Sequence, residues 1–92
     1  MNRDELVTAI SEKSGLPKTS VAKFLSAFVE VIKDAVGGGD KVTLVGFGTW
    51  YRSWREAREG RNPSTGEKMQ IKGRWGAKFK AGSDFSEKVN EG

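Results

Sequence analysis

The fold of this chain is decided by residues 55–66, which read Arg-Glu-Ala-Arg-Glu-Gly-Arg-Asn-Pro-Ser-Thr-Gly. They lie within the segment from Trp50 to Lys80, which holds nine of the sixteen cationic residues and only three acids. The segment therefore carries +6, and because the whole chain carries +4, the remaining residues sum to −2. Such a local concentration of positive charge is typical of a surface that binds an anionic polymer.

The centre of this segment, residues 62–66, predicts a turn. Pro63 presets φ at the second turn position, and Gly66 tolerates the positive φ with which the chain leaves. Two basic limbs that meet at such a turn indicate a β-ribbon arm with Pro63 near its tip. An ordinary, merely solubilising hairpin also fits this pattern. Residues 53–59 contain good helix formers and an Arg55–Glu59 pair at i,i+4, so a short helix fits as well.

The length and composition predict a single, marginally stable domain that needs a partner. Leu, Ile, Val and Phe make up 20 of the 92 residues. If the arm projects into solvent, only about 60–70 residues remain for a core, a size that commonly requires a disulfide, a metal or a second subunit. Cysteine and histidine are absent, which excludes disulfides and the usual transition-metal sites. Oligomerisation is the remaining means of stabilisation.

The ends and hydropathy of the chain predict a soluble, cytoplasmic protein that does not bind membranes. No apolar run approaches the ~20 residues that span a bilayer. The first six residues, Met1 to Leu6, are too charged for a signal peptide.

Two helices are predicted in the N-terminal part. Asn2 and Glu5 have the spacing of a capping pair, and Gly15 is placed to end the first helix. The second helix should run from Lys18 to Val36, entered through Pro17, with Thr19 or Ser20 as capping oxygens. Its apolar residues form two adjacent stripes, wider than one short helix can cover, which indicates a dimer interface. The stripes are Val21, Phe24, Phe28, Val31 and Ala35, and Leu25, Val29, Ile32 and Val36.

The rest of the chain predicts three strand regions and a last helix. Gly37–Gly39 break the second helix, and paired glycines at 46 and 48 mark a bulge or a close backbone approach, with Phe47 pointing into the core. The expected strands are residues 41–45 and 49–55 on one limb, 68–72 returning from the turn, and a short piece at 78–80. A final helix should begin at Ser83 or Asp84 and pack Phe85 and Val89 together.

Several runs of this sequence together carry a family likeness. They are Gly39-Asp-Lys-Val-Thr-Leu-Val-Gly-Phe-Gly-Thr49, Ala57-Arg-Glu-Gly-Arg-Asn-Pro63, Thr65-Gly-Glu67 and Phe79-Lys-Ala-Gly82, with Met1-Asn-Arg3, Leu6 and Glu12-Lys-Ser-Gly-Leu16 in agreement. With them the chain resembles the bacterial histone-like HU proteins, whose superfamily includes integration host factor. The likeness covers essentially the whole chain.

The resemblance implies an α+β fold: an intertwined homodimer with a helical base under a β-sheet saddle and two protruding β-ribbon arms that bind DNA. It divides the single domain, 1–92, into a dimerisation base (1–36), saddle strands (41–51 and 77–82), the arm (52–76) and a C-terminal helix (83–90). The expected interface residues are Phe24, Phe28, Val31, Ile32, Leu44, Phe47 and Phe79.

The implied function is architectural, largely sequence-independent DNA binding in the nucleoid, which the protein would bend and compact. The arms would grip the minor groove, and Pro63 would insert between base pairs. Nicked, gapped, bulged or junction DNA should bind best, because part of the bending cost is already removed. The expected DNA-binding residues are Arg3, Arg52, Arg55, Arg58, Arg61, Asn62, Pro63, Lys68, Lys72, Arg74, Lys78 and Lys80.

The sequence also departs from the family pattern. Its returning limb, residues 72–78, has two glycines and three cations, and serines stand at 53, 83 and 86 where basic residues are common. With a tip at residues 63–65, positions whose numbers sum to about 129 face each other, so Trp54 should lie near Trp75. The pair would stiffen the arm, the favoured interpretation, or one indole would stack on a sugar or a base edge.

Alternative functions also follow from these residues. A sequence-preferring, host-factor-like or phage-encoded DNA-bending protein fits the altered limb, and RNA is a conceivable secondary ligand. An enzyme is not expected, because the chain has no His or Cys and its acids are scattered. No cofactor is expected.

Overall fold

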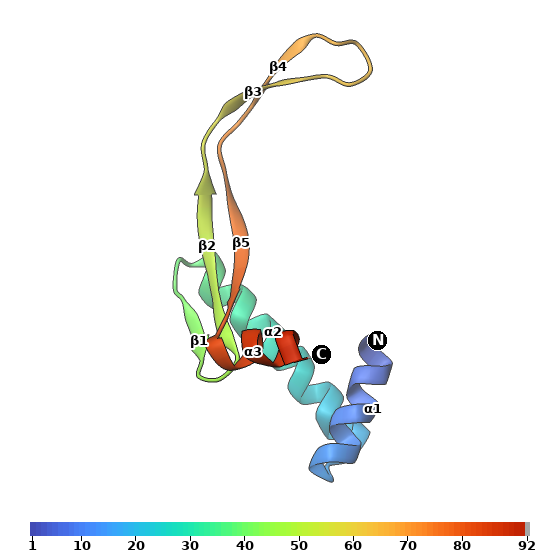
Figure 1. Ribbon diagram of the computed structural model, residues 1–92. Coiled ribbons are helices and arrows are strands. Elements are labelled where there is room, and N and C mark those ends of the chain that lie inside the picture. The colour runs from blue at the N-terminus through green and yellow to red at the C-terminus, as the bar shows by residue number, and fades with distance from the viewer. Residues whose placement is uncertain (92) are drawn as a thin grey trace. The chain divides into compact units, whose positions relative to one another are not determined.

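A computed structural model describes residues 1–91 (Figure 1). Three helices and five strands follow one another in the order α1, α2, β1, β2, β3, β4, β5, α3, which is the predicted α+β class. The chain divides into two compact units, residues 1–34 and the residues from 35 onward. None of the described helices is long and apolar enough to cross a membrane.

Helix α1, Arg3–Ser14, begins and ends as its capping residues predict. The Asn2 side chain accepts a hydrogen bond from the backbone N–H of Glu5 at 2.9 Å. Gly15 has φ 76°, a left-handed conformation in which its N–H donates to the Ser11 carbonyl at 2.9 Å. Both ends of the helix therefore satisfy backbone groups that would otherwise lack partners.

Helix α2, Lys18–Gly37, begins at the predicted residue and ends one residue later than predicted. Thr19 and Ser20 lie inside its first turn, so neither caps it from outside. Of the apolar stripes, Val21 is 2% exposed, but Phe24 and Val31 are 64% and 66% exposed in the single chain. Val29 is exposed as well, and the other stripe residues apart from the buried Val36 are half-buried, so part of the wide apolar face is left uncovered.

Strands β1, Val42–Leu44, and β2, Gly48–Arg55, form an antiparallel pair. The glycines between them do not make a bulge, because Gly46, at φ 85°, lies in a turn that joins two separate strands. The prediction of a close backbone approach is correct for Gly48. A Cβ there would lie 2.5 Å from Phe79 Cζ and 2.6 Å from the Lys80 carbonyl oxygen.

Strand β5, Arg74–Ala81, pairs with β2 along all eight of its residues. The predicted short strand at 78–80 is therefore too short. Strands β3, Arg58–Arg61, and β4, Lys68–Ile71, form a separate two-stranded sheet farther along the arm. These strands exclude the alternative helix at 53–59.

One register runs through the whole arm. Trp54 pairs with Trp75 in the first sheet and Arg58 with Ile71 in the second, and both pairs of numbers sum to 129. The ladder opens at residues 56–57 and 72–73 without a shift of register. Figure 1 shows the two limbs running side by side from β2 and β5 to β3 and β4.

Helix α3, Ser83–Glu91, completes the second unit. Phe85 stacks on Phe47 with ring centroids 5.2 Å apart, and Phe47 also contacts Trp50 and Phe79 at 5.5 and 5.4 Å. Phe47 therefore packs against other aromatic rings, as an inward-pointing side chain would, but it remains 42% exposed in the single chain and is not buried in a core. Val89 remains 67% exposed, so the apolar face of α3 is only partly covered within this chain.

Candidate nucleic-acid interface

The β2–β5 ribbon has one cationic face. Side chains alternate between the two faces of a strand, and the register places Arg55 opposite Arg74. Lys78 pairs with Tyr51 and Lys80 with Thr49, four and six residue pairs closer to the root of the ribbon on the same face. These four cations therefore form a row along one side of the ribbon.

The opposite face of the ribbon is aromatic. Trp50 contacts Phe79, with ring centroids 4.8 Å apart, at the root of the ribbon. Trp54 contacts Trp75 edge to face, with centroids 5.2 Å apart, farther out. The predicted facing of the two tryptophans is thus confirmed. The apolar side of the sheet continues outward along the first part of the arm.

Arg52 lies on this aromatic face, opposite in direction to Ser53, as strand alternation predicts. Its guanidinium is 4.0 Å from the centroid of the Trp75 ring and donates a hydrogen bond to the Gly37 carbonyl at 3.3 Å. Arg52 is half-buried, while Arg55 and Arg74 are exposed. The structure therefore does not bring Arg52 together with the cationic row.

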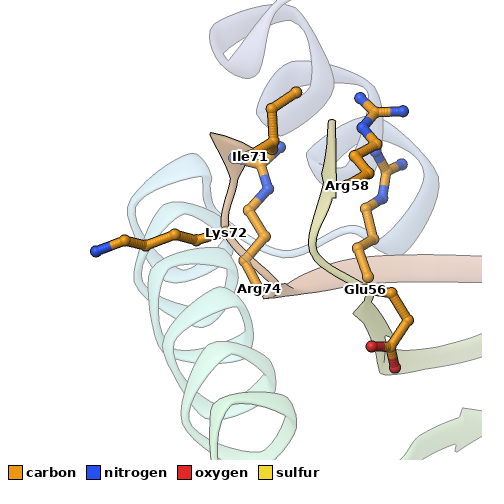
Figure 2. Close-up of a pocket in the computed structure, with 6 residues that line it drawn as sticks. Glu56, Arg58, Ile71, Lys72 and Arg74 are labelled. Carbon is orange, nitrogen blue, oxygen red and sulfur yellow. The ribbon is translucent and has the colours of Figure 1, made fainter. Parts of the chain in front are cut away.

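A cationic hollow of about 380 Å³ lies where the arm ladder opens. Figure 2 shows its lining side chains around the gap between the two limbs. Four cations and one carboxylate, Glu56, line the hollow, and within residues 1–91 none of these cations forms an ion pair, so the hollow keeps a net positive charge. Its positive charge is available to a phosphate group. The lining residues are Arg55, Glu56, Arg58, Ile71, Lys72 and Arg74.

The tip of the arm is held by its own hydrogen bonds. The Asn62 side chain accepts from the Ser64 N–H at 2.9 Å, and the Asn62 N–H donates to the Glu67 carbonyl at 2.8 Å. Gly66 has φ 73°, as the turn prediction required, and donates to the Asn62 carbonyl at 2.7 Å. Pro63 is exposed at the end of this closed loop.

The remaining predicted binding residues lie at two other places. Lys68 pairs with Arg61 at the tip-side end of β3 and β4, and both are exposed. Arg3 lies in the other compact unit, where its guanidinium donates to the Ala22 carbonyl at 3.2 Å and to Ser26 Oγ at 2.7 Å. Arg3 therefore links α1 to α2.

Sequence reasoning missed two close contacts in the arm. A Cβ on Gly73 would lie 2.5 Å from Trp54 Cζ2, so only glycine leaves room for this indole. A Cβ on Gly60 would lie 2.8 Å from Ile71 Cδ1. The constant register could have indicated both contacts, because it places Gly60 diagonally across the ladder from Ile71 and Gly73 diagonally across from Trp54.

The described residues offer no cluster of three or more acidic, His or Cys side chains that could hold a metal ion. What they offer instead is an exposed, cationic, two-stranded arm, an arrangement typical of nucleic-acid-binding proteins that use a β-ribbon. The comparisons with known proteins agree. The chain belongs to the bacterial DNA-binding protein family, whose model matches residues 1–90.

Within this family, the similar proteins belong to the HU group. The chain is 51% identical to DNA-binding protein HU of Nostoc sp., over 97% of this chain and 95% of the relative. It is 46% identical to DNA-binding protein HU of Clostridium pasteurianum, over 99% and 100%. An Anabaena HU–DNA cocrystal structure matches with a TM-score of 0.93 and 50% identity, over 97% of each chain. The chain is accordingly an HU-family architectural DNA-binding protein and not an enzyme.

Proposed function

We propose that this protein bends DNA by gripping the minor groove with its arm and inserting Pro63 between base pairs. The observation that carries the proposal is an exposed proline at the end of a closed turn, on a ribbon whose arginines form no ion pair within residues 1–91. A rigid apolar wedge replaces part of the base stacking that is lost at a kink. Unstacking costs a few kcal/mol per step, and the bend recovers it through further phosphate contacts.

Affinity in this proposal comes from phosphates and shape rather than from base edges. The cationic row and the hollow supply positive charge along the path from the β2–β5 ribbon to the tip. The minor groove distinguishes A·T from G·C but little else, so binding is largely independent of sequence. The residues assigned to DNA contact are Arg55, Arg58, Arg61, Asn62, Pro63, Lys68, Lys72, Arg74, Lys78 and Lys80, with Arg3 reaching flanking DNA.

The working form is a homodimer with two arms. Within the described residues the single chain buries only three hydrophobic side chains: Val7, Val21 and Val36. Its α2 face and part of its aromatic cluster stay open, with Phe47 42% and Phe79 40% exposed. A second copy would cover both. In this proposal residues 1–36 form the dimerisation base together with Leu44, Phe47 and Phe79, and residues 52–76 form the arm.

Dimers with two wedges would favour DNA that already bends easily, namely nicked, gapped, bulged or junction DNA. Many copies that bend DNA without sequence preference would compact and organise the bacterial nucleoid.

The test is to titrate linear, nicked and junction DNA of equal length at several salt concentrations. We expect a steep salt dependence together with tighter binding of the nicked and junction forms. Pro63→Ala should remove much of the preference and leave the salt slope unchanged, because alanine removes the wedge but no charge. Equal binding of linear and nicked DNA by the unaltered protein would overturn the wedge.

A sequence-preferring bender is the second candidate, favoured by the unusual limb at 72–78, which adds Lys72, Arg74 and Lys78 beside Trp75. Comparing selected sites with random duplex separates the two candidates, since only the second predicts a large ratio of affinities. Competition with RNA of equal length tests whether the arm also accepts RNA.

A further inference from the structure

Arg52 differs from the other four cations of β2 and β5, because it alone lies on the aromatic face of the ribbon. From its contacts we propose that Arg52 is a positioning residue that fixes the direction of the arm against the carboxyl end of α2 and does not itself bind DNA. The effect of this positioning on DNA binding rests on the function proposed above, whereas the contacts of Arg52 are independent of that proposal. We call Arg52, Gly37 and Trp75 the arm latch.

The first contact of the latch is with the helix end. The Arg52 Nη1 donates to the carbonyl of Gly37, the last residue of α2. Carbonyls in the last turn of a helix have no partner within the helix and carry its negative partial charge. A guanidinium group donates a hydrogen bond to such a carbonyl and also places a positive charge beside it, and it still has further N–H groups that can donate.

The second contact uses the space beside Gly39. A Cβ at this position would lie only 2.9 Å from Arg52 Nη2, and Gly39 has φ 93°. The turn that follows α2 therefore passes close to the guanidinium, and its glycine leaves the side chain room to reach the Gly37 carbonyl.

The third contact of the latch connects Arg52 to the outer part of the β2–β5 ribbon. The guanidinium lies over the Trp75 ring, Trp75 meets Trp54 edge to face, and Trp54 covers Gly73, where the ladder opens. A continuous series of contacts thus runs from the end of α2 to the opening of the arm. It sets the direction of the first half of the arm and so the position from which Pro63 approaches the duplex.

The test compares Arg52→Met with the matched control Arg55→Met, in the full-length protein with linear and nicked duplexes. Both variants lose one positive charge from neighbouring parts of the same strand. If Arg55 contacts a phosphate, its loss lowers the salt slope by about 0.9 per contact. Arg52→Met should leave the slope unchanged and reduce the preference for nicked over linear DNA. A slope that falls as much as in Arg55→Met would show that Arg52 binds phosphate and would overturn the proposal.

A second readout needs no DNA. Hydrogen exchange of the β2–β5 amides should be faster by about two- to fivefold in Arg52→Met, the range of an exposed cation–π contact. Trp75→Leu should produce an overlapping effect, so the double variant should show less than the product of the two. Unchanged exchange in Arg52→Met would also overturn the latch. If the unaltered protein shows no preference for nicked DNA, the wedge fails, but exchange still decides the latch.

Arg52→Lys is a further variant in case Arg52→Met does not fold. Lysine retains the charge but lacks the planar fork that meets a carbonyl and a ring together. We expect it to accelerate exchange like methionine. Exchange at the unaltered rate in Arg52→Lys would mean that charge alone suffices, which contradicts the latch.

Discussion

Trp54 and Trp75 occupy the same rung of the β2–β5 ladder, with ring centroids 5.2 Å apart and ring planes at 69°. This edge-to-face geometry places the positive edge of one indole against the negative face of the other. Both rings lie on the face opposite the cationic row. The pair therefore lies away from the surface we assign to DNA, which supports its interpretation as a stiffener of the arm.

We expect Trp54→Leu to loosen the outer part of the β2–β5 ribbon. The edge-to-face pair should contribute about 0.5–1.5 kcal/mol beyond the burial of its area. Since an arm can open without global unfolding, the measurement is hydrogen exchange of the ladder amides, not the thermal midpoint. A double-mutant cycle with Trp75→Leu isolates the pair. An interaction energy near zero would mean that the rings are only neighbours.

The pairing of these tryptophans could be predicted from the sequence because a hairpin is symmetric about its tip. A tip at residues 63–65 fixes the register, which holds through both sheets of the arm. The ends of α1 were predictable for a similar reason. Asn2 and Gly15 act on backbone groups within a few residues of themselves.

The length of β5 was not predictable in this way. Gly73 and Gly76 by themselves predict a weak strand, because glycine weakens strands when nothing else acts on them. In the structure Gly76 pairs with Ser53 in a continuous ladder, and Gly73 makes room for an indole from the other limb. The site of Arg52 was equally hidden, because it depends on a carbonyl fifteen residues away.

Gly73→Ala should disturb the arm, whereas Gly76→Ala should not. A Cβ at 73 meets the Trp54 ring at 2.5 Å and the Arg55 carbonyl at 3.1 Å, while a Cβ at 76 has no neighbour closer than 3.8 Å. Relieving such a clash typically costs about 1–3 kcal/mol. We expect the altered tryptophan environment to appear in the near-ultraviolet circular dichroism of Gly73→Ala alone. Identical spectra for the two variants would contradict the close contact.

Asn62 should matter for the shape of the tip rather than for the stability of the protein. Its side chain accepts from the Ser64 N–H, a bond that fixes the loop on which Pro63 is exposed. Asn62→Ala removes this acceptor, a net loss of about 0.5–1.5 kcal/mol confined to the loop. The thermal midpoint should stay the same, because within residues 1–91 the tip loop is joined to the aromatic cluster only through the strands of the arm.

The measurement that checks the tip is the affinity for nicked relative to linear DNA at fixed salt. If a pre-shaped loop presents the wedge, Asn62→Ala reduces this ratio without changing the salt slope, because the variant keeps every cation. Thr65→Ala is the matched control. Its hydroxyl accepts from the Glu67 N–H at the longer distance of 3.3 Å, so its loss should matter less. Should the two variants lower the ratio equally, the Asn62 side chain would have no special part in holding Pro63.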